Sequence, residues 1–389
     1  MSFNFAVTDF GCKVNQYESN VIASNLERMG HRKTQIDDAN LIIVNTCAVT
    51  GRASANSTRY INRLKRKYPD KDIVAVGCQT RHTDDSLKLS RSFLIKSFIY
   101  LDHPSSLVNE IHGYTRAFLK VQQGCEASCT YCSIRSLKKP FFKRDVSKVL
   151  EEFELLLTSH PEVVLCATNF AEYDRLCELV EGIGKLSGRF RWRISSISPD
   201  SLTTELLELL ASDKRFCPHF HITAQSGNRG VLSSMGRRYT PDDIVYTVKE
   251  IKKLFKKPAF SLDIIVGFPG ESEDAFQDTL NLIDYISPVK VHAFGFSMRP
   301  GTKASLLPGA LPEKKIKERV RILIDLSEKA RMSNMEKAVG GIEEVLIEGN
   351  SRGYTRGYLP VIYPGAIKSG FYDMIIRGVE DKRLTASCI

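Results

Sequence analysis

The sequence Gly-Cys-Glu-Ala-Ser-Cys-Thr-Tyr-Cys at residues 124–132 places three thiols in one short segment. Cys125, Cys129 and Cys132 are spaced by four and three residues. Three cysteines can hold three irons of a 4Fe–4S cube, which leaves the fourth iron open to a small molecule that can receive an electron. A structural zinc site usually has four ligands in paired knuckles, and no cysteine or histidine follows Cys132 at knuckle spacing. The spacing therefore indicates an iron–sulfur cluster, with zinc or a set of unrelated thiols as the alternatives.

This segment follows the first strand in an alternating series of strands and helices. Strands are expected at residues 118–122, 163–168, 192–197, 220–225, 261–266 and 289–296. Helical patterns fall between them, the clearest at residues 146–157, 203–210, 242–255 and 274–286. Such a series of βα units predicts a parallel barrel or part of one, with its chemistry at the carboxyl ends of the strands. The three-cysteine segment lies at such an end.

Three more cysteines each follow an apolar run that is typical of a buried parallel strand. The runs are residues 5–10, 41–44 and 73–76, with helices expected at 18–29 and 53–68. Parallel strands end at one edge of their sheet, where open α/β sheets bind ligands, so the three thiols are expected to converge. The alternative is that they are small core residues. The cysteines that follow the runs are Cys12, Cys47 and Cys78.

The second of these helices is basic. Arg59, Arg63 and Arg66 recur at spacings of four and three residues and therefore share one face. Such a run is usually a solvated surface, but the acidic residues that would pair with it along the helix are missing here. Binding to phosphates is therefore an equal alternative.

After an expected helix at residues 313–334, short apolar runs broken by glycine predict a small antiparallel β-barrel or sandwich. Basic and stacking side chains in this region give a general reason to bind nucleic acid. They are Arg352, Tyr354, Arg356, Tyr358 and Tyr363.

The composition limits the class of protein. A length of 389 residues suggests two or three domains, with a boundary inside residues 84–112. No run of about 18 apolar residues and no signal peptide is present, so we expect a cytoplasmic protein that does not contact a membrane. The ten cysteines are then reduced thiols or metal ligands.

The net charge of +10, from 55 basic and 45 acidic residues, indicates a polyanionic partner. The four cysteines outside both triads are expected to be structural or incidental: Cys166, Cys177, Cys217 and Cys388.

With these parts placed, the chain resembles the radical S-adenosylmethionine (SAM) methylthiotransferases over nearly its full length. The resemblance is carried by the three-cysteine segment with its aromatic Tyr131 and by residues 116–122, 225–227, 237–240 and 263–271. Residues 11–19 and 45–50 resemble most the branch that acts on N6-threonylcarbamoyladenosine in tRNA. The chain departs from the family pattern at residues 133–140 and 165–169, although the latter stretch keeps Asn169.

The resemblance implies an α/β fold in three domains. These are an open parallel α/β domain at residues 1–105, a partial (β/α)6 barrel at 111–330 and a TRAM-like RNA-binding β domain at 331–389. It also implies SAM and two 4Fe–4S clusters as cofactors, the first held by Cys12, Cys47 and Cys78. The second is held by Cys125, Cys129 and Cys132, which are the catalytic residues. Contacts with SAM are implied for Tyr131, Asn169 and Gln225. The contacts with RNA are expected from the basic residues themselves, which are Arg59, Arg63, Arg66, Arg352 and Arg356.

The implied reaction uses both clusters. Reductive cleavage of SAM at the second cluster gives a radical that takes hydrogen from C2 of the adenine ring. The first cluster holds the sulfur, which a second SAM methylates. The implied partners are tRNA and an electron donor such as a flavodoxin or ferredoxin, and the protein is expected to be a monomer. The alternatives are isopentenyladenosine in tRNA or a ribosomal-protein aspartate as substrate, or a non-catalytic RNA-binding sensor of iron or oxygen.

Overall fold

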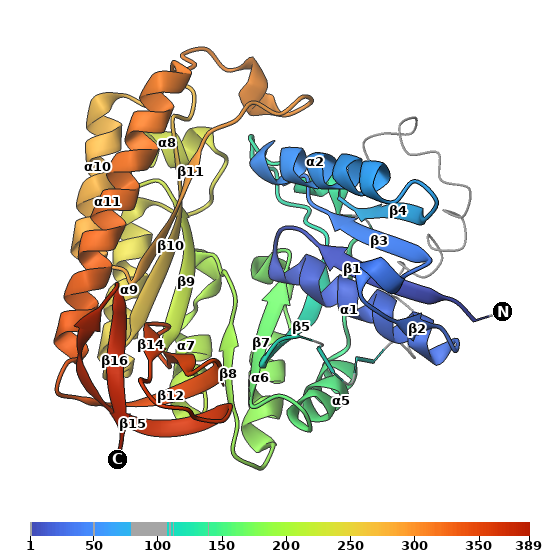
Figure 1. The fold of residues 1–389 in the computed structure, drawn as a ribbon. Helices are drawn as coiled ribbons and strands as arrows, with labels where there is room; N and C mark the ends of the chain where they lie inside the picture. The colour runs from blue at the N-terminus through green and yellow to red at the C-terminus, as the bar shows by residue number, and fades with distance from the viewer. Residues whose placement is uncertain (1, 50, 79–106, 109, 112, 139) are drawn as a thin grey trace. The chain divides into compact units, whose positions relative to one another are not determined.

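The computed structural model describes residues 2–49, 51–78, 107–108, 110–111, 113–138 and 140–389 (Figure 1). The expected boundary region at residues 84–112 lies largely outside the described residues. Two compact units are present: residues 1–127, 132–160 and 166–168 form the first, and residues 128–131, 161–165 and 169–389 form the second. Among the helices that the structure describes, none combines the length and apolar character needed to cross a bilayer.

The first unit contains a parallel four-stranded sheet between two helices (Figure 1). Its order is β2 (Arg32–Lys33), β1 (Asn4–Asp9), β3 (Leu41–Thr46) and β4 (Asp72–Gly77). Apolar residues of α1 (Lys13–Arg28) pack on one face, and those of α2 (Gly51–Lys67) on the other. Because both faces are covered, β3 is buried at every position, which explains its continuous apolar run.

The expected strands and both helices of this sheet are confirmed, with one change at α1. This helix was expected from Glu18 but begins at Lys13, so Cys12 is its N-cap residue. The unit also contains a strand pair, β5 (Arg116–Gln123) and β6 (Phe142–Lys143), with α4 (Ile134–Leu137) and α5 (Val146–Leu157).

The second unit contains the remaining parallel strands of the βα series. β7 (Glu162–Ala167) pairs with β8 (Arg191–Ile194) through residues 162–165, and β10 (Ala259–Val266) lies between β9 (His219–Gln225) and β11 (Lys290–Gly295). Single parallel bridges, Trp192 to Phe216 and Ile197 to Ile222, connect the two groups. The expected strands and helices are confirmed within four residues at their ends, and the strands form the predicted partial barrel. The helices are α6 (Leu176–Lys185), α7 (Thr204–Ser212), α8 (Arg229–Ser234), α9 (Pro241–Leu254), α10 (Glu273–Ile286) and α11 (Glu313–Ala338).

The alternation along β10 separates two faces of this sheet. Leu262, Ile264 and Val266 are fully buried, whereas Asp263 and Ile265 between them are partly exposed. Helix α11 packs on the neighbouring strand, where Ser327 accepts a hydrogen bond of 2.8 Å from the amide of Val291. The face that carries Asp263 is therefore the inner face of the partial barrel, opposite the face that packs on α11.

The C-terminal strands close into a small barrel. Their order is β12 (Ile342–Gly349), β13 (Arg352–Thr355), β14 (Pro360–Ile362), β16 (Arg383–Cys388) and β15 (Gly370–Glu380). All pairs are antiparallel except β14 with β16, which is parallel. The interior is filled by aliphatic side chains such as Val345, Met374 and Leu384, so the closed form of the two expected architectures is present.

Candidate active site

The first cysteine triad lies at one edge of the sheet in the first unit. Cys12, Cys47 and Cys78 follow β1, β3 and β4, which are adjacent and parallel. Cys47 and Cys78 are buried, and Cys12 is exposed at the start of α1. A helix N-terminus favours the thiolate form that iron requires. The expected convergence of these strand ends is therefore present.

Gly11 keeps this edge open. It has φ of +100°, and a Cβ atom there would lie 2.6 Å from Cys47 Sγ. Asn15 fixes the two neighbouring loops, because its amide nitrogen donates to the carbonyls of Phe10 at 2.9 Å and Thr46 at 3.0 Å. The backbone beside Cys12 and Cys47 is thus held from within the unit.

A buried ion network lies next to the triad. Lys138 Nζ is 2.8 Å from both Glu18 Oε2 and Asn15 Oδ1, and Lys120 Nζ is 3.5 Å from Glu18 Oε1. Burial raises the pKa of Cys78 to about 11, although the charge of Lys138 acts in the opposite direction. Burial lowers the pKa of Lys138, but Glu18, Cys78 and Cys12 raise it more, so the side chain stays charged. A cation fixed beside three thiolates offsets the negative charge of a bound cluster.

The second triad lies in the loop after β5. Gly124 has φ of +85°, and a Cβ there would lie 2.8 Å from the Cα of Phe141, so the turn requires glycine. Cys125 and Cys132 belong to the first unit and are partly exposed. The amide of Ile134 points to Cys132 Sγ at 3.5 Å, a contact that stabilises a thiolate.

Cys129 and Tyr131 belong to the second unit, where the loop is anchored by its backbone. The amide of Thr130 donates to the Met235 carbonyl at 3.0 Å, and the Thr130 carbonyl accepts from Ala304 at 2.8 Å. Tyr131 packs edge-on against Phe268, with 6.4 Å between ring centroids. This packing places the loop beside the carboxyl end of β10, because Phe268 follows that strand by two residues.

Arg237 completes this part of the site, and the sequence interpretation did not assign it a role. Its guanidinium donates to the Tyr131 hydroxyl and lies 5.6 Å from the Tyr131 ring centroid. Burial and the charge of Arg237 have opposite effects on Tyr131, and burial prevails, so the pKa of this phenol is raised well above its usual value. Arg237 Nε is buried and has no hydrogen-bond partner among the residues that the structure describes. A buried donor of this kind near Cys129 is suited to an anionic ligand.

The two other expected SAM contacts lie at strand ends. The Asn169 side chain accepts a 3.2 Å hydrogen bond from the Ala171 amide and begins the short helix Phe170–Glu172. Gln225 is buried at the end of β9 with φ of +66°. Their contacts with SAM stay predictions.

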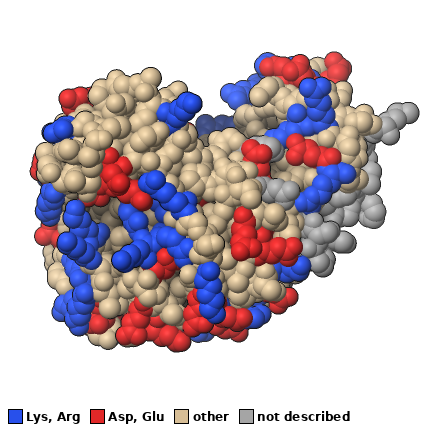
Figure 2. Space-filling view, turned by 90° about the horizontal axis from the view of Figure 1, so that it is seen from below, with Lys and Arg blue, Asp and Glu red and all other residues tan. Residues whose placement is uncertain are grey.

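The basic face of α2 is solvent-exposed at all three arginines. Arg59 donates to Asn56 Oδ1 at 2.6 Å, and the guanidinium of Arg63 lies 5.0 Å from the Tyr60 ring centroid. Arg66 donates to its own helix at the Asn62 carbonyl, 3.3 Å away. Figure 2 shows that Lys and Arg side chains also gather in groups on the face seen from below. These contacts leave the charged groups at the surface, as phosphate binding requires.

Two of the expected RNA-binding residues in the C-terminal barrel have other contacts. Arg356 donates to the Phe216 carbonyl at 2.6 Å and lies 3.6 Å from Glu344. Tyr358 stacks on His219 with 4.9 Å between ring centroids. Both side chains attach the barrel to the sheet of the second unit, and neither role was visible in the sequence. Arg352 is exposed on β13 and stays a candidate for RNA contact.

Comparisons with known proteins agree with this arrangement. Residues 119–283 match the radical SAM superfamily, and residues 4–95 match the uncharacterized protein family UPF0004. The chain is 33% identical to the threonylcarbamoyladenosine tRNA methylthiotransferase MtaB of Chlamydia pneumoniae, over 92% of this chain and 89% of that protein. It is 28% identical to a tRNA-2-methylthio-N(6)-dimethylallyladenosine synthase of Pelotomaculum thermopropionicum, over 93% of this chain and 92% of that protein.

Among solved structures, the fold is similar to that of the radical SAM methyltransferase TsrM of Kitasatospora setae, determined with cobalamin and a [4Fe-4S] cluster bound. The TM-score is 0.57 at 15% identity, and the match covers 78% of this chain and 77% of that chain. At this identity the match concerns the fold alone.

Proposed function

Because the chain belongs to the radical SAM methylthiotransferase family, we propose that it methylthiolates C2 of N6-threonylcarbamoyladenosine next to the anticodon of tRNA. The observation that carries the proposal is the presence of two separate cysteine triads, each at the carboxyl ends of parallel strands, in a chain with these relatives. The proposal includes a flavodoxin or ferredoxin as electron donor, a monomeric enzyme and a cytoplasmic location.

The residues at both triads fit 4Fe–4S clusters. Three thiols are available at each site, which leaves one iron open for another ligand. At the first triad, Gly11 leaves the space beside Cys47 that a side chain would fill, and Lys138 supplies a buried positive charge. At the second triad, the Nε of Arg237, which has no hydrogen-bond partner within the described part of the chain, is a donor for the carboxylate of SAM. Cys12, Cys47 and Cys78 would hold one cluster, and Cys125, Cys129 and Cys132 the other.

When bound, the clusters and SAM supply the electron, the radical and the sulfur that the reaction needs. The protein's own residues bind and orient. Tyr131 and Phe268 form an apolar wall at the loop, and Arg237 fixes the Tyr131 hydroxyl. A C–H bond of adenine offers no site for acid or base catalysis, so no general base is required for its cleavage. The arginines of α2 and Arg352 contribute phosphate contacts, which position tRNA without identifying it.

The decisive experiment supplies the anaerobically reconstituted protein with SAM and a reductant. Two tRNAs are compared, one with the threonylcarbamoyl group and one with the isopentenyl group, and the nucleosides are analysed by mass spectrometry. Methylthiolation of the threonylcarbamoyl tRNA is expected. Activity on the isopentenyl tRNA alone would favour the class of the 28%-identical relative. Release of 5′-deoxyadenosine without any modified nucleoside would favour another substrate, and no release would favour a sensor.

A further inference from the structure

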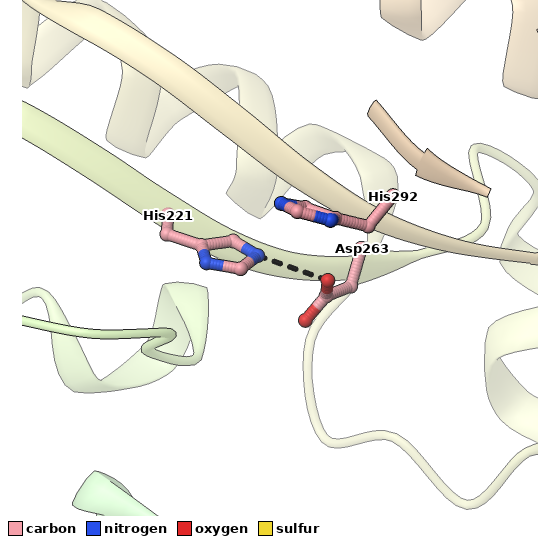
Figure 3. A group of neighbouring side chains, drawn as sticks. All are labelled: His221, Asp263 and His292. Atoms are coloured by element: carbon pink, nitrogen blue, oxygen red, sulfur yellow. Dashed lines mark hydrogen bonds and ion pairs between the residues drawn. The ribbon is translucent and has the colours of Figure 1, made fainter. Parts of the chain in front are cut away.

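Three polar side chains meet on the inner face of the partial barrel (Figure 3). They are His221 on β9, Asp263 on β10 and His292 on β11, one from each of three adjacent strands. His221 Nε2 lies 2.9 Å from Asp263 Oδ1, and the two imidazoles stack with 4.8 Å between centroids at 24°. One nitrogen or oxygen atom of each lies within 4.8 Å of the others, and all three side chains are partly exposed. We call this group the polar triad.

The polar triad lies on the same face as the cofactor loop of the second unit. Ile265 follows Asp263 by two residues and packs in the cluster that contains Tyr131, Phe268 and Phe296. His292, Phe294 and Phe296 are every second residue along β11 and just beyond its end, so all three lie on this face. Strand geometry gives a distance of about 13 Å between the Cα atoms of His292 and Phe296. Phe294, between them, is 39% exposed. Along this face the polar triad comes first, the exposed ring of Phe294 second, and an apolar cluster third. This cluster contains Tyr131, Ile265, Phe268 and Phe296, and we call it the Tyr131 cluster.

This order matches a modified adenosine. An exposed aromatic ring is a platform on which a base can stack. A base there would have one edge toward the Tyr131 cluster and the other toward the polar triad. The threonylcarbamoyl group carries a carboxylate, a hydroxyl and a urea, which need hydrogen-bond donors and acceptors. The isopentenyl group carries none of these and would exclude water from the polar triad without forming hydrogen bonds with it.

We propose that His221, Asp263 and His292 bind the polar N6 substituent of the substrate adenosine, with Phe294 stacked on its base. The inference rests on the proposed function and assigns it a specificity subsite. His292 donates to the carboxylate or carbonyl oxygens of the substituent. His221 donates its Nε2–H to Asp263, so its Nδ1 accepts from a hydroxyl or urea N–H, and the Asp263 carboxylate orients His221 and accepts from another such group. The subsite discriminates between the two substituents because the apolar isopentenyl group cannot form hydrogen bonds with these polar side chains.

The test compares His292→Ala, His292→Gln and Asp263→Asn with the wild type. A matched control is His31→Ala, which removes an imidazole that stacks on Phe3 in the first unit. The quantity measured is the ratio of kcat/KM on tRNA with the threonylcarbamoyl group to kcat/KM on the same tRNA without it. We expect this ratio to fall by about tenfold or more in His292→Ala and Asp263→Asn. His292→Gln keeps a donor and should recover part of the ratio, and His31→Ala should keep the wild-type value.

Three outcomes would overturn the inference, and they are distinguishable. A wild-type protein that does not modify the threonylcarbamoyl tRNA overturns the proposed function and the subsite with it. An active wild type whose ratio is unchanged in both His292→Ala and Asp263→Asn overturns the subsite alone. Two imidazoles and a carboxylate are also a ligand set for a first-row metal ion. Stoichiometric binding of Mn²⁺, measured by electron paramagnetic resonance on the holoenzyme and lost in His292→Ala, would assign the polar triad to a metal instead.

Discussion

The ammonium nitrogen of Lys138 lies 2.8 Å from Glu18 Oε2, and the two side chains are only 5% and 9% exposed. The pair connects the loop after the second triad to α1, whose N-cap residue is Cys12 of the first triad. Its effect on stability comes from the cost of leaving one charge buried after the other is removed. Lys120 is the other cation near Glu18, at the longer distance of 3.5 Å.

We therefore predict that Lys138→Met destabilises the first unit by about 2–4 kcal/mol, since Glu18 keeps only the weaker contact with Lys120. Hydrogen exchange of the β3 amides measures this, because the single tryptophan, Trp192, lies in the second unit. Glu18→Gln combined with Lys138→Met should recover part of the loss. A double variant as unstable as the single one would show that packing, and not the unpaired charge, is responsible.

Lys120 gives a prediction about pH. Burial lowers the pKa of Lys120 to about 8 from a usual value of 10.5, although Glu18 raises it. Between these two values the unfolded chain binds more protons than the folded chain, so the stability of the first unit should rise with pH across this window. The gain is at most about 3 kcal/mol and is lost as the pH falls to 8. Hydrogen exchange corrected for intrinsic rates should show the rise in the wild type and a smaller one in Lys120→Met.

The sequence predicted the parts of the site that follow from local pattern. Strands that end in Cys12, Cys47 and Cys78 could be read from apolar runs, and their order in a parallel sheet brings their ends to one edge. Lys138 gave no such signal, because it lies in a basic stretch of ordinary appearance and its burial depends on Glu18, 120 residues away. Arg237 was noticed only as part of a family pattern, since its contact with Tyr131 spans 106 residues.

Contacts between distant residues were not visible either. Arg356 and Tyr358 were expected to contact RNA because basic and aromatic residues often do, and that contact stays a prediction; nothing in the sequence indicated that Arg356 donates to main-chain carbonyls around residue 215. The polar triad was missed because one side chain comes from each of three strands. Only the register of β9, β10 and β11 brings the three together.

Gly11 offers a test of the first cluster site that leaves every cysteine in place. Gly11→Ala adds a methyl group that would clash with Cys47 Sγ, and its φ of +100° is strained for alanine. We expect the variant to lose about half of its iron and sulfide and to retain reductive cleavage of SAM. Gly30→Ala is the matched control, because Gly30 has φ of +85° and no described atom lies within 4 Å of its added Cβ. Equal iron in both variants would contradict a cluster at this edge.

Tyr131 gives a test of the second site. Replacing Tyr131 by alanine removes the ring that packs on Phe268 and the hydroxyl that accepts from Arg237. We expect the affinity for SAM to fall by about tenfold while the iron content stays at the wild-type value. Tyr131→Phe keeps the ring and should lose less. Isothermal titration calorimetry of SAM into the iron-loaded variants measures both affinities. An unchanged affinity in Tyr131→Ala would show that this residue only packs in the core.

The basic face of α2 gives the last prediction, which concerns tRNA. Arg59 and Arg63 are exposed and lie four residues apart on one helix face. If they contact phosphates, Arg59→Glu with Arg63→Glu should weaken tRNA binding and reduce the slope of log K against log salt by about two. Lys249→Glu with Lys253→Glu on α9 is the matched control, since it reverses two exposed charges at the same spacing and changes the net charge equally. Filter binding over a range of salt concentrations measures both pairs. Because net charge alone would affect the two double variants alike, equal slopes would show that α2 is a solvated surface and not a tRNA contact.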